Sequence, residues 1–151
     1  IADRSRMRLC RTTGAGGYTD RVMSPPRIAV TNFVSASPQR RFVIALSGGL
    51  DSRTLLHVAA SLRGELGFDL RAIHVDHGLH PDSARWAERC RAWCAAVAVP
   101  LDIARVQVSR IAELGLEAAA RAARHAAFAE RLDEDEVLLA ADLAGVGHLG
   151  Q

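Results

Sequence analysis

The sequence predicts an α/β fold in which a parallel sheet is covered by helices on both faces. Short apolar runs of strand length alternate with longer segments of helical period from Phe42 to Ala140. Turn formers such as Gly67 and Pro100 separate the two kinds of segment. Strands that alternate with helices build a parallel sheet with right-handed crossovers. Ligands of such sheets bind beyond the carboxyl ends of the strands, so we look for function at that edge.

The expected elements follow one another closely along the chain. Strands are expected at residues 42–46, 70–75, 101–108 and 137–140, where the runs are apolar and short. Helices are expected from about Ser52 to Glu65, from a cap at Asp82-Ser83 to just before Pro100, and from Leu116 to Leu132. An acidic turn, Asp133–Glu136, precedes the last strand. Cys90 and Cys94 fall on an apolar helix stripe, where packing explains them better than chemistry does.

A glycine-rich turn joins the first strand to the first helix. It reads Ser47-Gly48-Gly49-Leu50-Asp51-Ser52. Its glycines let the backbone N–H groups approach a ligand, its serines add hydroxyl donors, and the positive end of the helix dipole points at the same place. Such a turn binds phosphate. The alternative is a corner that the glycines only shape, with Asp51 or Ser52 as a helix cap.

Asp51 indicates a divalent cation in this turn. A carboxylate directed at phosphates is repelled unless a cation lies between them, so we expect Asp51 to hold Mg²⁺. The chain contains no lysine, since all 19 residues counted as Lys or Arg are arginine. A Walker A loop, which needs a lysine, is therefore excluded.

The second strand ends in a polar segment that reaches the same edge of the sheet. His74, His77 and His80 recur there at every third residue, with Asp76 among them. A metal cluster is one interpretation, but a turn that contains Gly78 would scatter these side chains. We favour His77 or Asp76 as a neighbour of a nucleotide, with the other residues shaping the turn.

The third helix carries two arginines on one side. Glu117 and Arg121 are four residues apart, and Arg124 lies about one turn further along. Guanidinium groups over a phosphate site would neutralise negative charge. On spacing alone, a solvated helix face with a salt bridge is the better interpretation.

Together these motifs resemble those of a known family. Ser47–Ser52 matches the SGGxDS loop of the PP-loop ATP pyrophosphatases, which split ATP into AMP and pyrophosphate. His74–Ala84 and Gly115–His125 are similar to the second motif and to the arginine-containing helix of the tRNA(Ile)-lysidine synthetases. His80 and His125 stand where that family usually has Arg and Tyr.

The resemblance implies a PP-loop ATPase fold, a ligase reaction that uses ATP and Mg²⁺, and tRNA(Ile) and L-lysine as substrates. In that reaction the wobble cytidine is adenylated and the lysine amine then displaces AMP. Asp51, Arg121 and Arg124 would be catalytic, and Asp51 would also hold the metal. The implied ATP-binding residues are Ala45, Ser47, Gly48, Gly49, Leu50, Asp51, Ser52 and His77.

The end of the chain departs from this pattern. The family continues after the last strand with an HHxDDQxET segment, whereas this chain reads Ala141–His148, in which Asp142 alone is a carboxylate. We therefore expect residues 42–151 to be the N-terminal part of a PP-loop ATP-binding domain, incomplete at the C-terminus and inactive or nearly so. Another PP-loop enzyme, such as a tRNA thiolase, and a nucleotide-binding module without catalysis are the alternatives.

Residues 1–41 differ in composition from the rest. They contain eight arginines but only Asp3 and Asp20 as acids, and they lack a sustained period. We expect a basic, disordered leader here. Three cysteines and no secretory pattern favour reduced thiols in the cytoplasm. The longest apolar stretch, near Ala92–Leu101, is too short to cross a bilayer.

Overall fold

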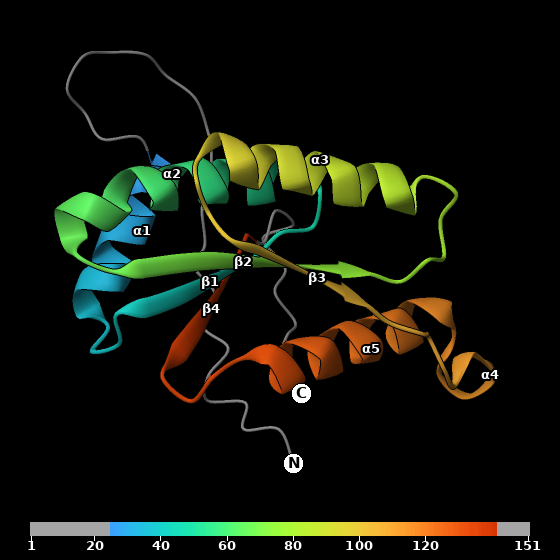
Figure 1. Cartoon of the computed structure of the whole chain (residues 1–151). Coiled ribbons are helices and arrows are strands. Elements are labelled where there is room, and N and C mark those ends of the chain that lie inside the picture. The colour runs from blue at the N-terminus through green and yellow to red at the C-terminus, as the bar shows by residue number, and fades with distance from the viewer. Residues whose placement is uncertain (1–24, 142–151) are drawn as a thin grey trace.

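Four parallel strands form the centre of the computed structural model, which describes residues 25–141 (Figure 1). Their order across the sheet is β3-β2-β1-β4. The strands are β1 (Arg41–Ala45), β2 (Asp69–Asp76), β3 (Leu101–Arg105) and β4 (Glu136–Ala140). The helices are α1 (Pro25–Ala36), α2 (Leu50–Leu66), α3 (Ser83–Ala96), α4 (Ile111–Leu114) and α5 (Leu116–Arg131).

Strand β1 lies between two partners because its side chains are apolar on both faces. It pairs in parallel with β2 and with β4. Phe42 and Ile44 are buried in a cluster with α1, α2 and α3, whereas Val43 points the other way, into a cluster with α5. This alternation follows from the pleat of a strand. The position of β1 brings the turn after it to the middle of the carboxyl edge.

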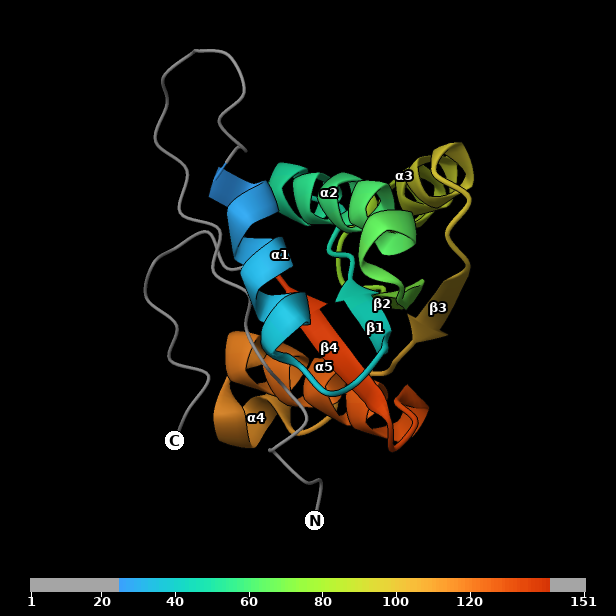
Figure 2. The same ribbon diagram turned by 90° about the vertical axis from the view of Figure 1, so that its left-hand side faces the viewer.

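Helices cover both faces of the sheet, as predicted. Helices α1, α2 and α3 lie on one side and α5 lies on the other (Figures 1 and 2). Buried Leu55, Leu62 and Cys90 belong to the first cluster, and buried Ala127 and Phe128 belong to the second. The α/β fold with a parallel sheet is therefore confirmed. No helix within residues 25–141 is both long and apolar enough to span a membrane.

Helix α1 corrects the prediction of a disordered leader for residues 25–36, whereas residues 1–24 of the predicted leader lie outside the described residues. It begins at Pro25-Pro26, where proline suits the first turn because the N–H groups of that turn have no partner within the helix. It packs along α2 (Figure 2), with Val30 and Val34 fully buried. A helix with two buried residues has too weak a period to be seen in the sequence. The contact with α2 stabilises it instead.

Two boundaries on the carboxyl side also differ from the prediction. Strand β3 ends at Arg105 and not at Val108, because its partner β2 ends at Asp76 in the same register. The short helix α4 was not predicted. It precedes Gly115, whose φ of 78° separates it from α5.

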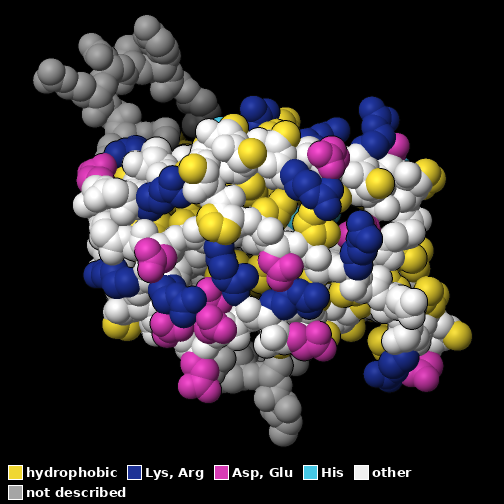
Figure 3. Space-filling model, viewed as in Figure 1, with side chains coloured by type: hydrophobic (Ala, Val, Ile, Leu, Met, Phe, Trp, Pro, Cys, Tyr) yellow, Lys and Arg dark blue, Asp and Glu magenta, His cyan; other side chains and the backbone are white. Residues whose placement is uncertain are grey.

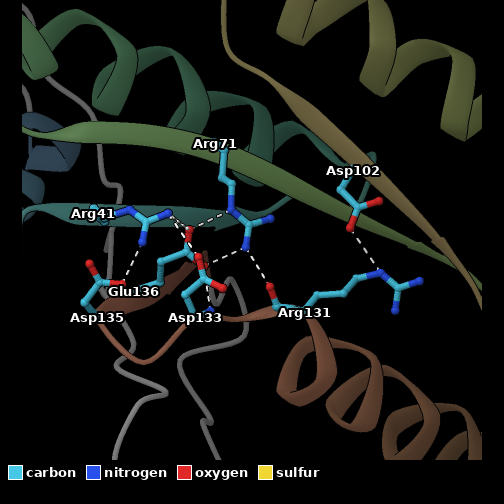
Figure 4. Close-up of polar contacts among 7 residues, drawn as sticks. All are labelled: Arg41, Arg71, Asp102, Arg131, Asp133, Asp135 and Glu136. Atoms are coloured by element: carbon cyan, nitrogen blue, oxygen red, sulfur yellow. Dashed lines mark hydrogen bonds and ion pairs between the residues drawn. The ribbon is translucent and has the colours of Figure 1, made fainter.

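An ionic cluster joins the strands at the amino edge of the sheet, opposite the turn after β1 (Figure 4). Glu136, expected in an acidic turn, is instead the first residue of β4 and is buried. Its carboxylate accepts from Arg71, and Arg71 also donates to the Arg131 carbonyl at the end of α5 at 2.7 Å. Arg41 pairs with Asp133 and Asp135. The cluster links β1 and β2 to the turn between α5 and β4.

Candidate functional site

The turn Ser47–Ser52 leaves β1 at the carboxyl edge and ends in the first turn of α2. Gly49 is the N-cap of α2, and no side chain within residues 25–141 caps this end of the helix. The first intrahelical bond runs from Arg53 N–H to the Gly49 carbonyl at 3.1 Å. The N–H groups of the preceding residues in this turn therefore have no partner within the helix. Together with the helix dipole they form a site suited to an anion.

The two serines of the turn brace it from within. Ser52 is buried, and its hydroxyl donates to the Gly49 carbonyl at 3.0 Å. The same oxygen accepts from the Ser47 N–H at 3.1 Å and from the Ser47 hydroxyl at 3.0 Å. The Ser47 hydroxyl oxygen accepts from the Gly49 N–H at 3.3 Å. In this arrangement both hydroxyl hydrogens and the N–H groups of Ser47 and Gly49 hold the turn in shape, and the N–H groups of the first turn of α2 remain as the donors for a ligand.

Gly48 packs the turn against α3. Its φ is +90°, in the region that favours glycine. A Cβ there would lie 3.4 Å from Trp86 Cβ and 3.9 Å from Cys90 Sγ. Arg89 Nη1 lies 3.5 Å from the Gly48 carbonyl oxygen. These contacts leave ordinary van der Waals room for a methyl group, so it is the conformation that calls for glycine at this position.

Asp51 has a buried oxygen that suits a cation. Its Oδ2 is buried, and no hydrogen-bond partner for it is found among residues 25–141. A buried carboxylate oxygen without a partner is costly, so such an atom indicates a ligand. Magnesium fits this donor, since Mg²⁺ is commonly held by one or two carboxylates, with phosphates and water as its other ligands. Ala45 is half-buried at the end of β1, and the Leu50 side chain is exposed.

The histidines after β2 do not form a metal cluster. Buried His74 donates from Nδ1 to the Leu46 carbonyl at 2.7 Å, which ties β2 to the end of β1. Asp76 accepts from the Gly78 N–H at 2.9 Å, and exposed His80 stacks on Trp86. Within the described residues no group of three or more His, Cys, Asp or Glu side chains is arranged to hold a metal. These contacts support the interpretation that the residues shape the turn.

His77 and Arg124 lie near enough to each other for the charge of Arg124 to act on the His77 ring, although they come from different elements. Burial lowers the pKa of His77, and the charge of Arg124 lowers it further. His77 Nδ1 is buried without a partner among residues 25–141, as is the Asp51 oxygen. Burial, and then the charge of Arg121, lowers the pKa of Arg124, which still remains protonated at neutral pH. A neutral imidazole therefore lies near a cationic guanidinium.

Comparison with known proteins decides the family. The family described as PP-loop domain matches residues 24–145. The chain belongs to the PP-loop domain family. The match begins just before α1, so this helix is part of the PP-loop domain and not of a separate leader.

The chain is also similar to curated proteins named tRNA(Ile)-lysidine synthase. The protein of Xanthomonas axonopodis pv. citri (strain 306) is 50% identical over 113 residues, which are 75% of this chain and 26% of that protein. The protein of Alkalilimnicola ehrlichii is 44% identical over 119 residues, 79% of this chain and 26% of its own length. That of Serratia proteamaculans is 48% identical over 103 residues, 68% of this chain and 23% of its own. The chain thus spans about a quarter of the length of the curated relatives it matches.

The predicted site residues of the PP-loop domain fall into two groups. The turn residues, Ala45 and His77 lie at the carboxyl edge, and so does Arg124 through its electrostatic contact with His77. Arg121 instead pairs with Glu117 at 3.5 Å, as a solvated helix face would. The roles assigned to these residues remain predictions. Asp142, the carboxylate expected after β4, lies outside the described residues.

The sequence analysis did not single out other arginines near the turn Ser47–Ser52, which we call the PP-loop from here on. Arg89 contacts the Gly48 carbonyl, Arg53 follows the turn directly, and Arg105 ends β3 beside Asp76. A signal for Arg89 was available, because it stands one helical turn before Trp93 on a helix that begins at the carboxyl edge. Its approach to Gly48 depends on the packing of α3, which the sequence does not display.

Proposed function

We propose that this chain is the ATP-binding part of an enzyme that attaches lysine to tRNA(Ile) at the expense of ATP. The observation that carries the proposal is the buried, unpartnered Asp51 Oδ2 at the uncapped start of α2, within a PP-loop. Membership in the PP-loop domain family supports ATP use. The relatives named tRNA(Ile)-lysidine synthase support tRNA(Ile) as the substrate.

Each part of the site has a role in this proposal. Backbone N–H groups of the PP-loop hold the phosphates, and Asp51 holds Mg²⁺. The metal, when bound, neutralises phosphate charge. His77 borders the nucleotide. Its Nδ1, which has no partner among residues 25–141, forms a hydrogen bond with the nucleotide. Arg121 and Arg124 offset negative charge that develops as pyrophosphate leaves, with Arg121 also paired with Glu117 on the same helix.

The reaction is the one that the resemblance implies. The carbonyl oxygen of the wobble cytidine takes the adenylyl group of ATP, and pyrophosphate leaves. The amine of L-lysine then forms the new carbon–nitrogen bond, and AMP leaves. Both steps build negative charge on phosphate oxygens, which fits a site made of backbone N–H groups and arginine.

A tRNA thiolase is less well supported. Such chemistry would need a reactive cysteine, and both described cysteines are buried on the inner face of α3. Burial raises the pKa of Cys90 to about 12 and that of Cys94 to about 11. Both thiols stay protonated at neutral pH, and a protonated thiol is a poor nucleophile.

A chimera tests the proposed function directly. Residues 25–141 would replace the matching segment of the Xanthomonas axonopodis relative, which is 50% identical to this chain. We expect the chimera to attach radiolabelled lysine to tRNA(Ile) in the presence of ATP and Mg²⁺. The same chimera with Asp51→Ala should attach none, whereas Asp69→Ala, at the opposite edge of the sheet, should leave attachment intact.

Two results would count against the proposal. If the chimera folds and binds ATP but attaches no lysine, the result would favour the alternative that this chain is a nucleotide-binding module without catalysis. Transfer of sulfur to tRNA, blocked by alkylation of Cys90 or Cys94, would favour the thiolase.

A further inference from the structure

A shallow hollow lies on α2 directly beside the PP-loop. It has a volume of about 340 Å³ and is lined by Leu50, Arg53, Thr54, His57 and Val58. These residues recur at the spacing of one helix face. Leu50 is 74% exposed and so presents a large apolar side chain to solvent at the start of the helix. The hollow thus combines exposed apolar surface with a guanidinium.

An arginine and tryptophan cluster continues this surface onto α3. The guanidinium of Arg53 lies 5.3 Å from the centre of the Trp93 ring, and that of Arg89 lies 5.9 Å from it. Trp93 is only half-buried, so part of the ring faces solvent. Figure 3 shows arginine side chains among hydrophobic ones on the upper part of the molecule, where α3 runs. We call Arg53, Arg89 and Trp93 the Arg–Trp cluster.

The two arginines of the cluster have no carboxylate partner in the described part of the chain. The other surface arginines of α3, Arg85 and Arg91, pair with Asp82 and Glu88. No ion pair within residues 25–141 includes Arg53 or Arg89. Within residues 25–141, therefore, no carboxylate neutralises their charge, and an anion can pair with it.

We propose that the hollow on α2 and the Arg–Trp cluster bind a single-stranded segment of RNA beside the PP-loop, an inference that rests on the proposed function. Bases stack on indole rings and on guanidinium planes, and phosphates pair with arginine, so this mixture of groups suits RNA in both respects. Arg89 contacts both Trp93 and the Gly48 carbonyl, so the surface leads directly to the PP-loop. A strand bound here brings a neighbouring base toward the ATP phosphates.

Binding of a labelled RNA by the whole chain tests this surface. The probe is a fluorescein-labelled single-stranded RNA of about ten nucleotides, and its affinity is measured by fluorescence anisotropy. Trp93→Ala should weaken binding about tenfold, and Trp93→Phe should restore most of the affinity, because a ring is kept. Arg53→Gln should weaken binding and reduce the salt dependence, the slope of log K against log salt, by about 0.7.

The matched control is Arg91→Gln. It removes the same charge from the same helix, but Arg91 is paired with Glu88 and is not part of the cluster. We expect little change in RNA affinity. Circular dichroism of each variant confirms the fold, since Trp93 also packs against the core.

Tryptophan fluorescence gives a readout that does not depend on a destabilising variant. The chain has two tryptophans, so Trp86→Phe leaves the emission to Trp93 alone. A base stacked on the ring should quench this emission as the RNA is titrated. RNA that binds without quenching Trp93 would overturn the inference.

The two proposals fail in different ways. If the chain binds Mg-ATP and the RNA but the cluster variants keep full RNA affinity, the RNA is bound elsewhere, for example by the arginines of residues 1–24, and only this inference falls. If Mg-ATP binds and no RNA does, the inference also falls, and a polypeptide becomes the alternative ligand of the hollow. If Mg-ATP does not bind, the proposed function falls, while the quenching of Trp93 still decides whether this surface takes RNA.

Discussion

Arg71 and Glu136 form a two-point ion pair across the amino edge of the sheet. Arg71 Nε donates to Glu136 Oε1 at 2.7 Å and Nη2 donates to Oε2 at 2.6 Å, between residues 65 positions apart in the chain. Glu136 is almost completely buried, whereas the Arg71 side chain is 26% exposed. The pair joins β2 to β4 and so supports the sheet from the edge opposite the PP-loop.

Replacing Glu136 by glutamine should lower the free energy of unfolding by about 2 kcal/mol. The loss of stability arises because the Arg71 guanidinium is left without its counter-charge. Since the Arg71 side chain is partly exposed, we expect a smaller loss than for a fully buried pair. Urea denaturation followed by circular dichroism measures it. Asp135→Asn, in the same cluster but exposed, should change stability little. Equal stability of Glu136→Gln and the wild type would show that the pair contributes nothing.

The stability should also fall in acid because of Glu136. The hydrogen bonds from Arg71 hold the pKa of Glu136 below its ordinary value. A carboxyl group whose pKa is lower in the folded state stabilises the fold above its unfolded pKa, about 4.3, and this contribution is lost as the pH falls through the folded value. Urea denaturation at a series of pH values should show the loss below about pH 4.3. In the Glu136→Gln variant the free energy of unfolding should depend less steeply on pH in this range. The same pH dependence in the variant and the wild type would show that Glu136 does not cause the loss.

Gly48→Ala should destabilise the chain and weaken ATP binding. The substitution places a Cβ at a φ of +90°, a backbone conformation that side chains rarely adopt, so we expect a loss of about 1–2 kcal/mol. Gly64→Ala is the matched control, because Gly64 lies in α2 with no atom within 4 Å of an added Cβ. It should stabilise the chain by about 0.5–1 kcal/mol. Thermal denaturation and calorimetric ATP titration measure both effects; opposite signs are expected for the two glycines.

Asp51→Ala should abolish magnesium-dependent binding of ATP. Its buried Oδ2 has no other partner among the described residues, so the loss of this carboxylate removes the predicted cation ligand. Isothermal titration calorimetry with ATP, in the presence of Mg²⁺ and of EDTA, measures the difference. Asp51→Asn should keep the turn but lose the response to Mg²⁺. Magnesium dependence that survives both substitutions would place the metal elsewhere.

Cys90 and Cys94 should react slowly in the folded chain. Burial raises the pKa of both thiols, so almost no thiolate is present at neutral pH. Iodoacetamide labelling followed by peptide mass spectrometry should modify them only when urea is added. Rapid labelling of either cysteine under native conditions would contradict this prediction and support the tRNA thiolase alternative.

Much of the site could be predicted from the sequence because its chemistry is local. The turn Ser47–Ser52 is contiguous, so its glycines, its serines and Asp51 are brought together by the chain itself. The strand before it and the helix after it are visible in the hydrophobic period. Helix α1 was not, because only Val30 and Val34 are buried and their burial depends on α2.

The sequence by itself thus determined the parallel sheet and the position of the PP-loop at its carboxyl edge. The tertiary structure alone decided that the serine hydroxyls face inward, that His77 approaches Arg124, and that Arg89 reaches the Gly48 carbonyl. The physical reason is the range of the contacts. Helix period and turn chemistry act between near neighbours in the chain, whereas packing between elements joins residues such as Gly48 and Arg89, which are 41 positions apart.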